Sequence, residues 1–155
     1  MAHGTAVRII YDQGYIGGRV MALITNIGAT DLSRANTTTP GTGTIDASVL
    51  DNHVSSPVLS IEKISWNTGG ITAGRYFSVI FTGSSDSTAV SLSGNGHWGK
   101  SHTAGLDAPI TNDAGTPTGD VAITTTNCDN AADTINVVII LKKVSGFTAR
   151  PDYSG

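Results

Sequence analysis

The feature that most constrains this chain is a series of short segments in which apolar and polar residues alternate. Alternation with a period of two is typical of strands that bury one face, whereas no segment keeps a helical period over three turns. Clusters rich in Gly, Ser, Asp and Pro separate the segments and are typical of turns. The predicted strands are 6–11, 18–25, 58–67, 75–82, 88–93, 119–126 and 134–143. They predict an all-β fold: an antiparallel β-sandwich, jelly-roll-like or immunoglobulin-like, with about 7–9 strands.

The composition also favours strands over helices. Charged residues make up 14% of the chain, well below the usual quarter, and there are 19 glycines. Thr favours strands, while Ser and Gly favour turns. The 155 residues are enough for one domain with a substantial core, which is predicted to span 1–155. A surface of uncharged polar residues is common in proteins that pack against other proteins, and also in secreted β-proteins.

The first irregular segment, 29–57, is too long for an ordinary connection. It is predicted to be a long loop, or an arm that becomes ordered on a partner. Within it, 43–54 is compatible with one helical turn capped by Thr44, because Ile45 and Val49 are four residues apart.

The second irregular segment, 144–155, is predicted to be an extended tail, because Pro151 prevents regular pairing. It carries two apolar rings, Phe147 and Tyr153. These rings are expected to pack either on the same domain or on a neighbouring subunit.

The last predicted strand, TINVVIILKK, is apolar on both faces. A strand in a sandwich usually has one wet face, yet here Val138 and Ile140 lie opposite the main apolar set of Ile135, Val137, Ile139 and Leu141. Burying each of these two would contribute about 1.5–3 kcal/mol. Their cover is segment 29–57, a central position in a layered core, or another protein chain. We favour another chain and predict an interface made by Val138, Ile140, Ile45, Val49, Phe147 and Tyr153.

The segment 58–67 changes face in its middle. Leu59 and Ile61 share one face, whereas Ile64 and Trp66 share the other. A β-bulge near Glu62–Lys63 is predicted, because one extra residue would return the apolar side chains to a single inward face.

The stretch SLSGNGHWGK at 91–100 places Gly94, Gly96 and Gly99 in a G-x-G-x-x-G spacing. A dinucleotide site needs a helix after this loop, and the residues that follow have no helical period. Asn95-Gly96 instead predicts a tight turn with positive φ at both residues. No nucleotide cofactor is therefore expected.

Metal-binding and catalytic patterns are also weak. His97 and His102 supply fewer ligands than a zinc site needs, and neither Asp113 with Asp120 nor the turn CDNAAD supplies the oxygens that calcium takes. No G-x-S-x-G elbow occurs, and Glu62 is the only glutamate. We therefore predict a protein that is not an enzyme and holds no metal or cofactor.

Four aromatic residues are candidates for stacking on sugar rings: Trp66, Trp98, Tyr76 and Tyr11. Tryptophan is highly buried on average, so a place in the core is the competing interpretation. A carbohydrate-binding module on a virion or secreted surface stays open as an alternative function.

The charge balance argues against polyanionic partners. Nine basic and twelve acidic residues give a net charge of −3, and Lys142–Lys143 is the one visible basic cluster. Nucleic acid and anionic membranes are not expected as partners, because both require a basic footprint. The run 137–141 is too short to span a bilayer, the N-terminus does not resemble a signal peptide, and the single Cys128 forms no intrachain disulfide.

Several pieces occur in a familiar order: LSIEKISWNTGG, YFSVIFTG, VSLSGNGHWGK, PTGDVAITTTN and INVVIILKK. Together they resemble small β-rich virion structural proteins of tailed bacteriophages, over residues 59–143. The resemblance implies a capsid decoration (cement) protein on the outer capsid surface, made in the host cytoplasm. It further implies the major capsid protein as partner and a homo-oligomer, with a trimer favoured. Tail and adaptor roles are alternatives, and no catalytic residues follow from the resemblance.

Overall fold

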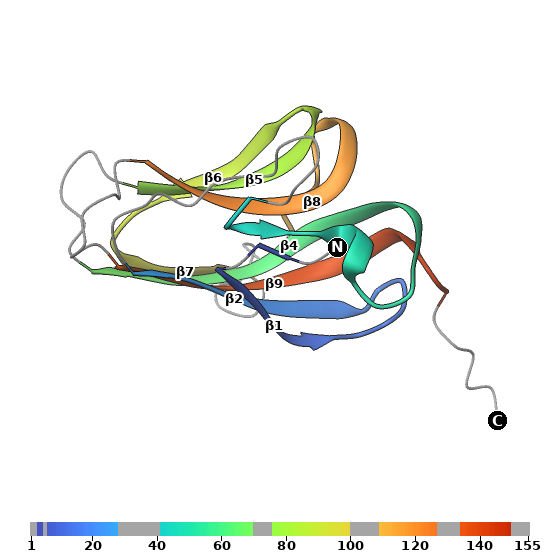
Figure 1. Ribbon diagram of the computed structural model, residues 1–155, viewed down its shortest axis with the longest axis horizontal. Helices are drawn as coiled ribbons and strands as arrows, with labels where there is room; N and C mark the ends of the chain where they lie inside the picture. The colour runs from blue at the N-terminus through green and yellow to red at the C-terminus, as the bar shows by residue number, and fades with distance from the viewer. Residues whose placement is uncertain are drawn as a thin grey trace.

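The computed structural model describes residues 3–4, 6–27, 41–69, 76–99, 109–126 and 134–149, which form two antiparallel sheets packed face to face (Figure 1). The helical structure in this part of the chain is one 3₁₀ turn, η1 (Ala47–Val49). The strands are β1 (Val7–Asp12), β2 (Arg19–Ile27), β3 (Thr44–Ile45), β4 (His53–Gly69), β5 (Tyr76–Ser85), β6 (Ser87–Leu92), β7 (Asn95–Gly99), β8 (Gly115–Thr126) and β9 (Thr134–Phe147). All the predicted strands are confirmed, and β3 and β7 are additional.

The strand order is that of a jelly roll. One sheet has the order β1-β2-β9-β4-β7 and the other has the order β3-β8-β5-β6. β2 pairs with β9, β3 with β8, β4 with β7 and β5 with β6. From β2 onward, each strand therefore pairs with the strand at the same distance from the other end of the series. The chain is therefore one long antiparallel hairpin rolled into two layers, as in jelly rolls. This confirms the predicted sandwich and decides against the immunoglobulin-like order.

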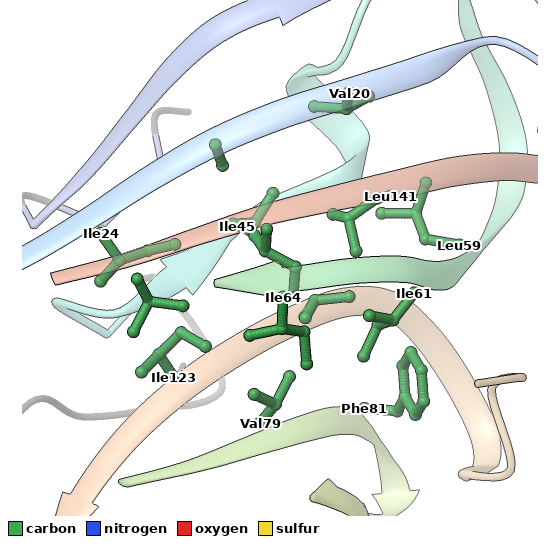
Figure 2. Packing of buried hydrophobic residues seen from close by; sticks show 14 of the residues in the cluster. Val20, Ile24, Ile45, Leu59, Ile61, Ile64, Val79, Phe81, Ile123 and Leu141 are labelled. Atoms are coloured by element: carbon green, nitrogen blue, oxygen red, sulfur yellow. The ribbon is translucent and has the colours of Figure 1, made fainter. Parts of the chain in front are cut away.

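The core lies between the sheets and is filled by their inward faces. Figure 2 shows Ile64 of β4 facing Val79 of β5 and Ile123 of β8. The predicted inward set of β9 is buried: Ile135, Val137, Ile139 and Leu141. Because fully burying one aliphatic side chain is worth roughly 1.5–3 kcal/mol, this layer is the main source of stability.

The predicted β-bulge in β4 is confirmed. The register of β4 against β9 shifts between Ile61 and Lys63, so both Ile61 and Ile64 are buried in the core. Gly99 of β7 pairs beside this bulge with a φ of 130°. A Cβ at Gly99 would collide with the carbonyl oxygen of Glu62, which is why glycine is required there.

The predicted long loop or arm at 29–57 is wrong for residues 41–57, which are built into the sandwich as β3, η1 and the start of β4. β3 pairs with β8, and Ile45 is fully buried in the core. The predicted helical turn is present, but its cap is Asp46, whose carboxylate accepts a hydrogen bond from the Ser48 N–H at 2.9 Å. Residues 28–40 lie outside the described part of the chain.

The N-terminal segment continues the layer beyond β3. The Gly4 N–H donates to the Thr44 carbonyl at 2.8 Å, and the Ala6 N–H donates to the Thr42 carbonyl at 2.9 Å. The carbonyl of the same residue, Ala6, accepts a hydrogen bond from the Thr25 N–H of β2 at 3.1 Å. Backbone hydrogen bonds therefore join the two sheets along this side and hold the 41–45 segment in place.

The predicted tail at 144–155 starts too early, because β9 continues to Phe147. Phe147 is buried, so it is not a free ring on a tail. The strand end is hard to see in the sequence because Gly146, with a φ of 84°, breaks the alternation where β4 and β9 change register. Tyr153 lies outside the described residues.

Candidate protein-interaction surface

The outer face of the five-stranded sheet carries a central row of aliphatic side chains. The register places Met21 of β2 beside Ile140 of β9, and Leu23 beside Val138. The residues between them along both strands are buried in the core, so these four side chains point away from it. All four are half-buried. We call Met21, Leu23, Val138 and Ile140 the aliphatic row.

Exposed apolar residues continue the aliphatic row onto the edge strand β1. Tyr11 pairs with Met21 and is 40% exposed. The register shifts between Ile9 and Tyr11, and Ile10, the extra residue of this bulge, is 47% exposed. Single exposed apolar residues are ordinary, but a contiguous group of them is typical of an interaction site.

One ion pair crosses the same face. Arg19 of β2 reaches over β9 to Glu62 of β4, with Nε donating to Oε2 at 3.0 Å and Nη2 donating to Oε1 at 2.9 Å. The hydrogen bonds that Arg19 donates to Glu62 are the main reason that the pKa of Arg19 is raised above its ordinary value. Both oxygens of the only glutamate are thus occupied by one bidentate partner.

Three further cations border the aliphatic row. Arg8 of β1 pairs with Leu23, Lys63 of β4 pairs with Ile140, and Lys142 lies two residues beyond Ile140 on the same face of β9. None of the three forms an ion pair with another residue in the described ranges. The strands of the other sheet contain no Lys or Arg, and Asp120 is their one charged residue.

Lys143 lies on the inner face of β9, unlike its neighbour Lys142. Its side chain is fully buried, and Nζ lies 2.5 Å from Oδ1 of Asp12, 2.9 Å from the Asp51 carbonyl oxygen and 4.7 Å from the ring centre of Phe147. A buried ammonium needs such partners because removing a charge from water is costly. Sequence reasoning missed this role, although the inward alternation of β9 continues directly to position 143.

A half-buried carboxylate, that of Asp120, lies where η1 meets β8. Oδ1 of Asp120 accepts from the Ala47 N–H at 2.9 Å, and the Asp46 N–H donates to Nδ1 of His3 at 3.0 Å. Burial raises the pKa of Asp120 to about 6, and the Asp46 charge adds to this effect, against the opposing Ala47 hydrogen bond. Burial likewise lowers the pKa of His3. These contacts fasten η1 and the N-terminal segment to the sandwich.

The structure separates the predicted interface residues. Val138 and Ile140 lie together in the aliphatic row, and Val49 is half-buried at the end of η1. The prediction is wrong for Ile45 and Phe147, because both lie in the core and present no surface to a partner. Sequence reasoning overlooked half of the aliphatic row, although the run VMALI in β2 is also apolar on both faces.

The G-x-G-x-x-G stretch forms a strand. Asn95–Gly99 is β7, paired with β4, so the tight turn predicted at Asn95-Gly96 is wrong, and the positive φ of 69° belongs to Gly94. A Cβ at Gly96 would lie 2.7 Å from the indole of Trp66, its partner on β4. An aromatic ring over a strand glycine restores the packing that glycine lacks, which is how Gly96 fits in a strand.

The two tryptophans pack partly buried against the core, and Nε1 of Trp66 donates to the Ser93 carbonyl at 3.0 Å. Tyr11 and Tyr76 are each 40% exposed. No group of three His, Cys, Asp or Glu side chains suited to a metal ion occurs among the residues that the structure describes, and His102 lies outside them.

Comparisons with protein-family models, with curated proteins and with solved structures give no match. Within the described ranges, no helix has the length and apolar character needed to cross a membrane. The fold and surface define the class: a jelly-roll β-sandwich with one outer face that is both apolar and basic.

Proposed function

We propose that this protein is a structural virion protein of a tailed bacteriophage, which binds and stabilises the capsid shell as a decoration protein. The observation that carries the proposal is the aliphatic row, half-buried at the centre of an outer sheet face. Apolar groups of this kind are typical of the centre of a protein–protein interface. Jelly rolls occur in viral capsid proteins and in lectins, so the fold agrees with this role but does not distinguish it from carbohydrate binding. The preference for a capsid-binding role rests on the apolar surface.

Decoration requires adhesion and no chemical step. Covering the aliphatic row contributes about 25 cal/mol for each Å² of apolar surface removed from water. Each contact is modest, but a homotrimer engages three rows at once, and the second and third contacts are intramolecular. A small domain can therefore hold neighbouring shell subunits together.

The test is co-expression with the major capsid protein encoded in the same genome. Shells are purified on a density gradient, and the copies of this chain on each shell are counted by quantitative mass spectrometry. The wild-type chain is expected to co-sediment with shells. Val138→Asp is expected to lower its occupancy at least tenfold, because docking would bury an unpaired carboxylate.

The matched control is Thr88→Asp, at an exposed position of β6 in the other sheet. Circular dichroism should show both variants folded, with normal occupancy for Thr88→Asp. A wild-type chain that sediments apart from the shells would overturn the function. Normal occupancy of Val138→Asp would overturn the assignment of this face.

The trimer is tested separately by light scattering on the purified chain. The expected mass is three times the 15.9 kDa of one chain. A monomer at every concentration contradicts the trimer and leaves docking of single copies as the mode of binding.

A further inference from the structure

We infer that the partner of this face is a protein surface that places carboxylates around an apolar centre, and that it is neither a nucleic acid nor a second copy of this chain. The inference rests on the proposed function, because it names the chemistry of the partner that the aliphatic row docks against. It follows from how the charges of the described residues are distributed.

The accessible cations of the described strands are gathered on one face. The chain as a whole carries a net charge of −3. Nevertheless, apart from the buried Lys143, every Lys and Arg of the described residues belongs to the outer face of the five-stranded sheet, the layer labelled β1, β2, β9, β4 and β7 in Figure 1: Arg8, Arg19, Lys63 and Lys142.

Three of these cations are available to a partner. Arg19 is held by Glu62, and both carboxylate oxygens of Glu62 are used in doing so. Arg8, Lys63 and Lys142 have no such carboxylate among the described residues. They stand on three sides of the aliphatic row: toward the β1 edge, over β4 and at one end of β9.

In this arrangement the aliphatic row would supply apolar contact area, and the three bordering cations would determine which partner binds. Long basic side chains lay their stems along apolar surface and keep the charge at its border. A partner that covers the row removes water from these three charges, which is costly unless carboxylates replace the water. Complementary rim charges mainly increase the association rate and the selectivity.

Two other occupants fit the face less well. Two copies packed face to face by a two-fold axis would bring the same three cations against one another, which is repulsive. A nucleic acid would satisfy the cations with phosphates, but its backbone offers no apolar complement to the aliphatic row. A protein surface supplies both carboxylates and apolar contact.

The first experiment measures association with purified shells between 50 and 500 mM NaCl. The variant Arg8→Gln/Lys63→Gln/Lys142→Gln keeps the aliphatic row and removes the three charges. Its association rate at low salt should fall about tenfold, with most of the salt dependence lost. The control Thr88→Lys adds a cation to the other sheet and should change neither quantity. A triple variant with the wild-type rate and salt dependence overturns the inference and leaves the proposed function standing.

The second experiment needs no shell, so it still decides the inference if the proposed function fails. Backbone amide shifts are followed by NMR as poly(Glu,Tyr) copolymer or 20-bp duplex DNA is added. The copolymer offers carboxylates with apolar rings and should shift residues around the aliphatic row, an effect that the triple variant loses. Tighter binding of DNA, no binding of the copolymer, or dimerisation of the wild-type chain that Val138→Asp abolishes would each overturn the inference.

Discussion

The two outer faces of this sandwich cover one core but differ in what they need from their surroundings. On the four-stranded sheet, hydroxyl groups satisfy one another: Ser78 Oγ lies 2.7 Å from Ser91 Oγ, and Thr82 Oγ1 lies 2.5 Å from Thr118 Oγ1. On the five-stranded sheet, the aliphatic row and its cations have no such internal partners among the described residues. These hydroxyl groups of the first face are thus satisfied within their own sheet, whereas the second face gains free energy when its aliphatic row is covered.

The largest loss of stability should come from replacing Lys143, the lysine on the inner face of the five-stranded sheet. Lys143→Ala leaves Asp12 without its buried partner and should lower the free energy of unfolding by about 3–5 kcal/mol. Lys142→Ala, on the outer face, should change it by about 0.5 kcal/mol or less. Urea denaturation of both variants measures the difference. Equal costs would mean that the two lysines are not divided between core and surface.

The next largest loss of stability is expected in β9, where isoleucine occurs on both faces of the strand and the two faces can be compared directly. Ile139→Ala opens a cavity in the core and should cost about 2–5 kcal/mol. Ile140→Ala removes a half-buried side chain of the aliphatic row and should cost about 1 kcal/mol, with a much larger loss of shell occupancy. Thermal unfolding and shell co-sedimentation measure the two properties. A reversed order of stability would contradict the assignment of the faces.

A smaller effect tests the one charged residue in the strands of the four-stranded sheet. The pKa of Asp120 is about 6 in the folded chain, above the ordinary value of 3.8. Its contribution to stability is therefore full below pH 3.8 and is lost as the pH rises through 6. Asp120→Asn should match the wild type near pH 4 and exceed it at pH 7 by about 1–2 kcal/mol, after allowance for partial exposure.

The measurement for Asp120→Asn is urea denaturation of both chains at several pH values. The lowered pKa of His3 acts in the opposite direction, because its contribution is present above pH 6.5 and is lost on acidification. Comparing variant with wild type at each pH cancels the His3 contribution. A stability difference that does not change with pH would contradict the raised pKa of Asp120.

The smallest effect concerns the ion pair that crosses the interaction face. Glu62→Gln replaces two charge-assisted hydrogen bonds with a neutral contact and should cost about 1 kcal/mol in urea denaturation. The change also frees Arg19, so this face gains a fourth unpaired cation. Association with shells at low salt should then become faster. Slower association would show that the ion pair itself takes part in docking.

The sequence pattern predicted the parts of the fold that depend on neighbouring residues along one strand. The inward sets of β5, β8 and β9 and the bulge at Glu62–Lys63 were readable because side chains alternate along a strand. β3 was not readable, because two residues are too few to show a period. β7 resembled a turn because the ring that covers Gly96 belongs to Trp66, which is 30 residues away.

Only part of the candidate surface could be predicted from the sequence, because the pattern along one strand says nothing about which strand lies beside it. Val138 and Ile140 stood out as the second apolar face of their strand. Met21 and Leu23 join them through the register of β2 against β9, which links residues more than 100 positions apart. The placement of Ile45 and Phe147 in the core depended on β3 pairing with β8 and on β9 continuing past its glycine.

By itself, the sequence determined that this chain is all-β and that its last strand is apolar on both sides, because both properties follow from a period of two along the backbone. Tertiary structure alone decided the jelly-roll order, the burial of Lys143 beside an exposed Lys142, and the gathering of Arg8 and Lys63 around the aliphatic row. The physical reason is that these properties depend on the register between strands distant in the sequence, and the packing of the whole core selects that register.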